Sequence, residues 1–374
     1  MHPLRHRRLR LERAARIALS ASSASMRSAR DRLRRGRARQ DLQETPTQSP
    51  DDLLRFADRV TERLLEGVPR LARQLRRDRR TLAITLEAVW GDAFDLYDAI
   101  AYASYEQGAR WAAEATVDDA TRPIVWSTLL DLHARACCVA AEVGVLQRTG
   151  FPSGAEARHR TLHELAVIAA VLQDSDEEIT RRYRDFEAVE HYQDAKAYQE
   201  HAEALGRTPL PDGEMAILLA WHDEVVDRWG GKSFARPLGW AAPICSKSNP
   251  GIADLEGLAG VAHLRPFYRY GNHAVHGGPR AAALQRIDIE GKPHRTPGAT
   301  VYADFAETGH GAIILLQQVN AALLSELTRS DGIDTDSVVA LGSLNQLVNQ
   351  CGDAFGAAAD VARSRGWFLH GRDD

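Results

Sequence analysis

The stretch Ser153–Gln173, which reads SGAEARHRTLHELAVIAAVLQ, predicts a helix from about residue 154 to residue 173. Ser153 and Glu156 have the spacing of a capping box, which satisfies amide groups at the start of a helix. Arg160, His163 and Glu164 then fall three and four residues apart, so they share one face of the helix. Because such groups are costly to bury unless they pair, this face either locks the fold through a polar network or carries chemistry.

A second polar motif lies in the segment 272–277, which reads NHAVHG. Asn272 and His276 are four residues apart, so they share one face of a helix that we expect over 254–276. The glycines at 277 and 278 and Pro279 end this helix. The chain thus places imidazoles on two helices of an otherwise plain helical sequence.

Capping signals and apolar residues at helical spacing predict helices along most of the chain. The expected helices begin near Pro50 and cover about 81–115, 123–148, 154–173, 175–205, 214–229, 254–276, 309–329 and 335–365. Ile287 and Ile289 alternate with acids, and together with a turn that begins at Gly291 and a return over 301–305 they predict a hairpin. The expected fold class is all-α, a helical bundle with short connections and one small β-hairpin excursion.

Charge is unevenly distributed. Residues 1–40 hold thirteen arginines and two acids, a charge of +11 (13 − 2), which leaves −15 for the rest of a chain whose total is −4. Such a basic arm can bind nucleic acid or an anionic membrane surface, and a disordered tail is the plainer alternative. We expect a basic, disordered arm and linker over 1–48, a helical segment over 49–120, a helical core with the Arg/His motifs over 121–330, and a C-terminal helix packing on the core over 331–374.

Several classes of function lack their sequence signals. The chain has no Gly-x-x-x-x-Gly-Lys phosphate loop, no Gly-x-Gly-x-x-Gly and no Gly-x-Ser-x-Gly, so we expect no cofactor. His159 and His163 lack the His-Glu-x-x-His order of a zinc site, and Arg160 between them would repel a dication, so we expect no metal.

The cysteines and the apolar segments bear on the compartment. Four cysteines without a Cys-x-x-Cys motif, two of them adjacent at 137 and 138, fit a reducing cytoplasm. No segment reaches about eighteen uninterrupted apolar residues, so we expect no membrane span.

An arginine and a histidine on one helix can cleave RNA without a metal. A histidine that titrates near neutrality takes the proton of the 2′-hydroxyl, and a guanidinium stabilises the charge that develops on the phosphate. Arginine–histidine pairs with four to six residues between them are no more frequent here than chance gives, so context has to distinguish them. Arg158 with His163, near a helix start, and Arg269 with His276, beside Asn272 and a glycine exit, have the most suitable context.

Over about 125–280 the chain resembles a known family. The residues that carry the resemblance are Gly150-Phe151-Pro152, the heptapeptide RHRTLHE at 158–164, and the late Val275-His276-Gly277, with Glu142, Arg182, Glu190 and Tyr268 in order between or before them. This is similar to an uncharacterised bacterial all-helical domain-of-unknown-function family, which implies no particular activity. A looser, fold-level similarity to HEPN-type ribonucleases implies an RNA endonuclease of the toxin or phage-defence kind, dimeric through its motif helices, with an antitoxin or other protein as partner.

Two hypotheses therefore remain open. In the first, the protein is a HEPN-like, metal-independent endoribonuclease that acts on RNA. Its catalytic residues are Arg160, His163, Arg269, Asn272 and His276, and its supporting polar residues are Glu142, Arg158, Glu164, Arg182 and Glu190. In the second, it is a non-catalytic helical interaction module, and the same polar residues only fix the helix register. An open cleft at His163 and His276 favours the enzyme, and sealed histidines favour the module.

Overall fold

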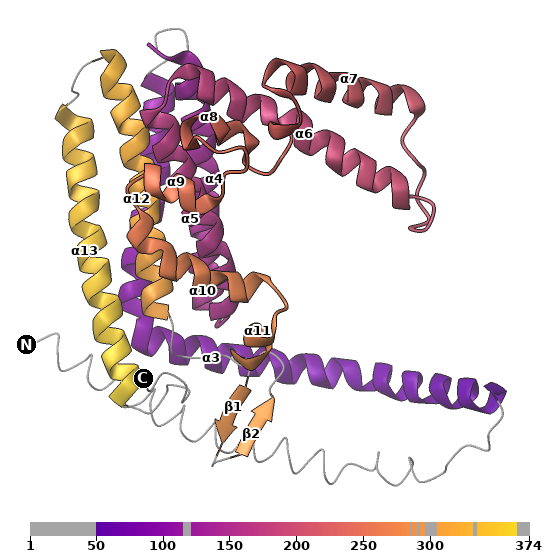
Figure 1. The fold of residues 1–374 in the computed structure, drawn as a ribbon. Helices are drawn as coiled ribbons and strands as arrows, with labels where there is room; N and C mark the ends of the chain where they lie inside the picture. Colours follow the sequence, from indigo (N-terminus) through magenta and orange to yellow (C-terminus); the bar gives the residue numbers. More distant parts are fainter. Residues whose placement is uncertain are drawn as a thin grey trace, which may run out of the picture. The chain divides into compact units, whose positions relative to one another are not determined.

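The computed structural model describes residues 50–114, 121–284, 286–289, 292–295, 305–331 and 335–364 (Figure 1). These residues are mostly helical, so the expected all-α class is confirmed. They fall into two compact units, one formed by 50–94 with 148–150 and the other by 95–147 with the remainder of the chain from 151. The expected basic arm over 1–48 lies outside the described residues.

The first unit consists mainly of the N-terminal part of helix α3 (Pro50–Glu114). One continuous helix therefore covers both the region after Pro50 and the helix expected over 81–115. Within this unit Arg148 forms an ion pair with Glu87 at 3.2 Å, and its guanidinium lies over the ring of Phe94 at 5.2 Å. Leu86, Trp90 and Phe94 are buried, whereas the residues of α3 that precede Thr81 are mostly exposed.

The second unit is a bundle around helix α5 (Pro152–Asp174). Helix α12 (Phe305–Asp331) packs against α5 and against α13 (Thr335–Ser364), and α10 (Arg265–Val275) and α9 (Ile252–Leu258) also pack on α5. Figure 1 shows α4 (Pro123–Arg148), α5 and α12 running alongside one another. Helix α6 (Glu177–His201) packs against α7 (Asp212–Arg228). The shorter elements are η1 (Gly231–Ser233), η2 (Gly239–Ala241), α8 (Ala242–Cys245), η3 (Ala262–Leu264) and α11 (Pro279–Leu284).

Two of the expected helix starts were wrong. Helix α5 begins at Pro152 after Phe151, whose side chain makes no capping bond, so Ser153 is already inside the helix. Proline at the first helical position explains this start, because its missing amide group would be unpaired there in any case. Helix α6 begins after Asp176, whose carboxylate accepts from the amide of Ile179 at 3.0 Å, and Ser175 instead ends α5.

The helix expected over 254–276 is divided. Helix α9 ends at Leu258, Gly260 has a positive φ of 70°, and the chain restarts as η3 and α10. Glycine adopts this left-handed conformation without the steric cost that a side chain brings. His276 has φ −102° and ψ 139°, so it follows the last helical residue and lies outside α10.

Strands β1 (Arg286–Ile289) and β2 (Lys292–Arg295) pair antiparallel, with Ile287 opposite His294. The return strand was expected over 301–305, and Phe305, the one described residue of that range, is helical. Residues 301–304 lie outside the described residues, and Phe305 begins α12.

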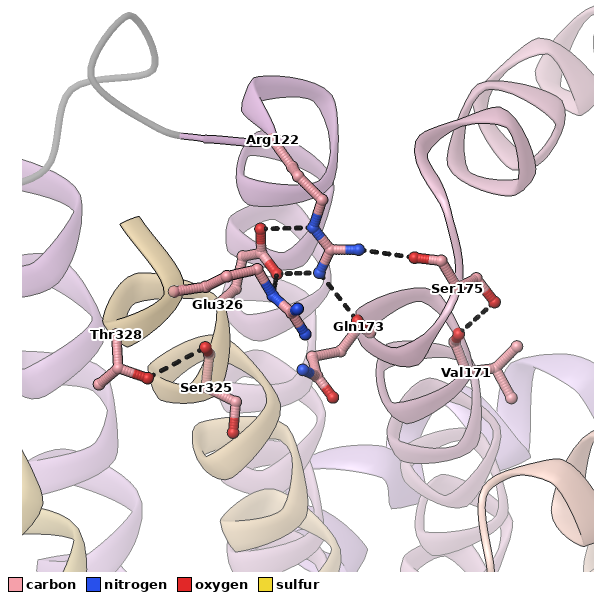
Figure 2. A network of polar contacts seen from close by, with 8 residues as sticks. Arg122, Val171, Gln173, Ser175, Ser325, Glu326 and Thr328 are labelled. Atoms are coloured by element: carbon pink, nitrogen blue, oxygen red, sulfur yellow. Dashed lines mark hydrogen bonds and ion pairs between the residues drawn. The ribbon is translucent and has the colours of Figure 1, made fainter. Parts of the chain in front are cut away.

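Polar side chains also cross-link the second unit. Arg122 donates hydrogen bonds to the carbonyl oxygens of Gln173 and Ser175 at 2.8 and 2.6 Å, at the C-terminal end of α5 (Figure 2). The same guanidinium forms a bidentate ion pair with Glu326 of α12, whose side chain is only 1% exposed. A second chain of bonds joins His133 of α4, Asn320 of α12 and Ser104 of α3, each at 2.9 Å.

Among the described residues, Phe305–Arg329 of α12 is long and apolar enough to cross a membrane, with a mean hydropathy of 1.2. Of its most apolar window, 67% is buried inside the protein, as in the core helix of a bundle.

Candidate functional site

The polar face of α5 lies beneath α10. Arg160, His163 and Glu164 come from α5, and Tyr268 and Asn272 come from α10. The two helices approach closely at Gly271, where a Cβ atom would lie only 3.2 Å from the Cβ of Arg160 and from the carbonyl oxygen of Glu156. Glycine at this position therefore permits the contact that joins the two motifs.

Arg160, Glu164, Tyr268 and Asn272 form one cluster. Nε of Arg160 donates to Oδ1 of Asn272 at 2.5 Å, and a terminal nitrogen donates to the hydroxyl of Tyr268 at 2.9 Å. Tyr268 in turn donates to Glu164 at 2.8 Å, and Glu164 forms an ion pair with Arg160 at 3.0 Å. Nε and one terminal nitrogen of Arg160 are thus directed to protein acceptors, and its guanidinium also lies 4.9 Å from the ring centre of Tyr268.

His163 belongs to a deeper chain of contacts. Its Nε2 lies 2.9 Å from Oε1 of Glu256 in α9, and the other carboxylate oxygen pairs with Arg265 at the start of α10. The side chains of His163 and Glu256 are 1% and 0% exposed. Burial lowers the pKa of His163, although Glu256 opposes this shift. A neutral His163 beside a carboxylate has its proton on Nε2, so the imidazole donates this bond.

A cavity of about 180 Å³ borders this chain of contacts. His159, His163, His310 and Glu307 line it together with apolar side chains of η3, α10 and α12. Burial lowers the pKa of His159 to about 4, helped by His163, and burial also lowers the pKa of His310. The cavity is smaller than the roughly 300 Å³ at which ligand pockets usually begin. The part of the chain that the structure describes contains no group of three or more His, Cys, Asp or Glu residues placed to hold a metal.

Arg269 is exposed in the middle of α10, and His276 is exposed just beyond its C-terminal end. Six residues separate them, and Asn272 is one of these. Among the described residues, the side chains of Arg269 and His276 make no hydrogen bond or ion pair. The structure therefore joins Arg160 to Asn272, and it leaves Arg269 and His276 outside that cluster and outside the contacts of His163.

The five supporting residues are distributed over separate places. Glu142 and Arg158 form a partly exposed ion pair between α4 and α5 at 2.5 Å, and Glu164 belongs to the Arg160 cluster. Arg182 is buried and donates to the carbonyl oxygens of Trp229, Gly239 and Trp240. Glu190 is exposed on α6 and lines a different cavity of about 610 Å³.

The sequence reasoning missed Glu256, Arg265 and His310 and gave Tyr268 no role. A detectable signal existed for part of this set. Arg265, Tyr268 and Asn272 are spaced three and four residues apart, so they share one face of α10. Glu256 had no such signal, because its helix is short and separated from α10 by the turn at Gly260.

No curated protein and no solved structure matches the chain. A protein-family model does match it, and the match includes most of α4, all of α5 and all of α10. Residues 127–292 match the family of unknown function DUF5677, which confirms the expected resemblance to an uncharacterised domain family.

Proposed function

We propose that the chain is a non-catalytic helical interaction module, in which the polar residues of α5, α9 and α10 hold the helices in register. The observation that carries this proposal is the burial of the His163–Glu256 pair, since a general base for RNA cleavage has to reach a 2′-hydroxyl. The neighbouring cavity of about 180 Å³ is too small for a polynucleotide. No disulfide joins the cysteines, which supports a cytoplasmic location.

The bonding of Arg160 supports the same proposal. Stabilisation of a phosphorane requires donors aimed at the phosphate position. Asn272, Tyr268 and Glu164 already occupy Nε and one terminal nitrogen of Arg160, and Tyr268 also couples Glu164 to α10. Such a closed set of bonds specifies one arrangement of two helices.

A metal-independent, HEPN-like endoribonuclease is the second candidate, and a specific observation favours it. Arg269, in the middle of α10, and His276, just beyond its C-terminal end, are both exposed, so solvent and RNA can reach them. In this alternative His276 acts as the base or acid, and Arg269 stabilises the phosphate. A toxin or phage-defence role and an antitoxin partner would accompany that activity.

Incubation of the purified full chain with total RNA and tRNA in EDTA separates the two proposals. The matched variants are His163→Ala, His276→Ala and Arg269→Ala, with the melting temperature of each protein measured alongside. The module predicts intact RNA in every sample and a lower melting temperature for His163→Ala alone. Cleavage by the wild type that His276→Ala and Arg269→Ala abolish without a change in melting temperature would overturn the module and support the ribonuclease.

A further inference from the structure

Helix α3 carries a row of exposed apolar side chains before it reaches its buried residues. Leu54, Leu64, Val68, Leu71 and Leu75 are between 45% and 67% exposed. They all lie in the part of α3 that belongs to the first unit. An exposed row of this size on one helix calls for a partner, because burying each leucine contributes about 2 kcal/mol.

The spacing of this row is that of a coiled coil. Alternating steps of three and four residues give two apolar positions per heptad, a and d, which face a partner helix. The positions Leu54, Ala57, Thr61, Leu64, Val68, Leu71 and Leu75 follow this pattern over three heptads, and we refer to them as the α3 seam. Thr61 fits within it, because its hydroxyl donates to the carbonyl oxygen of Ala57 at 2.9 Å and needs no partner.

The charges around the α3 seam identify the partner. The e and g positions flank a seam and face the same positions of the partner helix. Here they are Asp58, Val60, Leu65, Gly67, Ala72 and Gln74, of which one is charged. Within the α3 seam the arginines fall at the b, c and f positions, which point away from it, namely at 55, 59, 63, 70 and 73, whereas Arg79, beyond the seam, falls at an e position.

This distribution favours self-association. Two identical seams can face each other over these three heptads without bringing like charges together, because the arginines within the seam lie on the outer surfaces. A strongly acidic partner helix, or an anionic membrane, would instead be recognised by cations beside the apolar row. Pro69 also falls at a b position, so its ring lies away from the seam.

We infer that the α3 seam binds a second copy of this chain, so that the protein is a homodimer joined by its N-terminal helices. The inference deepens the proposed interaction module by naming its partner, and its evidence comes from α3 alone.

The mass of the full chain in solution tests this inference by multi-angle light scattering and sedimentation equilibrium. The seam variant Leu64→Glu/Leu71→Glu changes two d positions. Its matched control, Arg70→Glu/Arg77→Glu, places the same residue at two exposed c positions seven residues apart. A third variant, Leu64→Ala/Leu71→Ala, keeps a strong helix former at both seam positions, so that a lost dimer cannot be ascribed to a lost helix.

We expect a dimeric wild type, a dimeric control, a monomeric glutamate variant and an alanine variant whose dissociation constant rises more than about tenfold. A monomeric wild type, or a glutamate variant that keeps the wild-type mass, would overturn the inference. So would a monomer that sediments with anionic vesicles through the same leucines. Assaying RNA cleavage on the same samples separates the two proposals, because an active dimer overturns only the module and an inactive monomer overturns only the dimer.

Discussion

His163 and His276 occupy comparable places in the sequence motifs and opposite surroundings in the structure. The side chain of His163 is 1% exposed and donates to a buried carboxylate, whereas His276 is exposed beyond the last turn of α10. The difference arises from the place of each residue in its helix. His163 lies in mid-helix beneath α9 and α10, and His276 immediately precedes two glycines. Motif resemblance thus does not distinguish a residue that holds the fold from one that is available to a ligand.

The largest effect is expected at Glu256, the buried partner of His163. Replacing Glu256 with alanine leaves His163 and Arg265 without their shared carboxylate. We expect a loss of about 3 kcal/mol in the free energy of unfolding, because the buried imidazole of His163 loses its hydrogen bond to a charged group and the partly exposed Arg265 loses its ion pair. Urea denaturation measures it, with Glu200→Ala on the exposed face of α6 as the control. Equal losses in the two variants would show that burial does not set the role of this pair.

Acid should lower the free energy of unfolding of the protein through its buried histidines. The folded pKa of His159 is lowered to about 4 from an ordinary value of 6.5, so below pH 6.5 the unfolded chain binds a proton that the folded chain does not. The stability that the neutral, buried His159 contributes to the folded protein is therefore fully present above pH 6.5 and is lost as the pH falls towards 4. At 1.36 kcal/mol per unit of pKa it amounts to about 3 kcal/mol.

Urea titrations of the wild type and of His159→Gln across this pH range measure that contribution. The variant should lose part of the slope of stability against pH, because glutamine does not titrate. His276→Gln serves as the exposed control and should retain the wild-type slope. If the slope of His159→Gln equals that of the wild type, the burial of His159 does not govern the acid response.

Tyr268 tests the cluster that it forms with Arg160, Glu164 and Asn272. Replacing it with phenylalanine removes the hydroxyl that bridges Arg160 and Glu164 but keeps the ring beneath the guanidinium. We expect a loss of about 1.5 kcal/mol, the lower end of the range for hydrogen bonds to charged partners. Tyr105→Phe, at an exposed tyrosine of α3, is the matched control and should leave the melting temperature unchanged. A neutral Tyr268→Phe would mean that this cluster does not hold α10 on α5.

The smallest effect is expected at His276, the exposed histidine. His276→Ala should change the free energy of unfolding by less than about 0.5 kcal/mol, as is usual for surface positions without special contacts. The measurement is chemical denaturation beside His163→Ala. A loss at His276 as large as that at His163 would contradict the contrast between the two histidines.

The sequence predicted the helical class because capping residues and apolar spacing are local signals. It also placed Arg160, His163 and Glu164 on one face of a helix and Asn272 on another helix, but it did not predict the bond that Arg160 donates to Asn272. Glu256 escaped detection because its pairing with His163 depends on the turn at Gly260, which returns the chain towards α5. The clamp that Arg182 forms on three carbonyl oxygens was equally hidden, since backbone acceptors leave no trace in a residue pattern.

The ion pair between Arg122 and Glu326 also bears on the order of events during synthesis. Both residues lie outside the segment 127–292 that matches the family model, and 326 − 122 = 204 positions separate them along the chain. Helix α12, on which α5 packs, also comes after that segment. A ribosome therefore completes the whole family segment before it makes the helix that closes the bundle. Until then α5 lacks the helix that packs on it most extensively, so the packing of this part of the protein is completed only once α12 has been made.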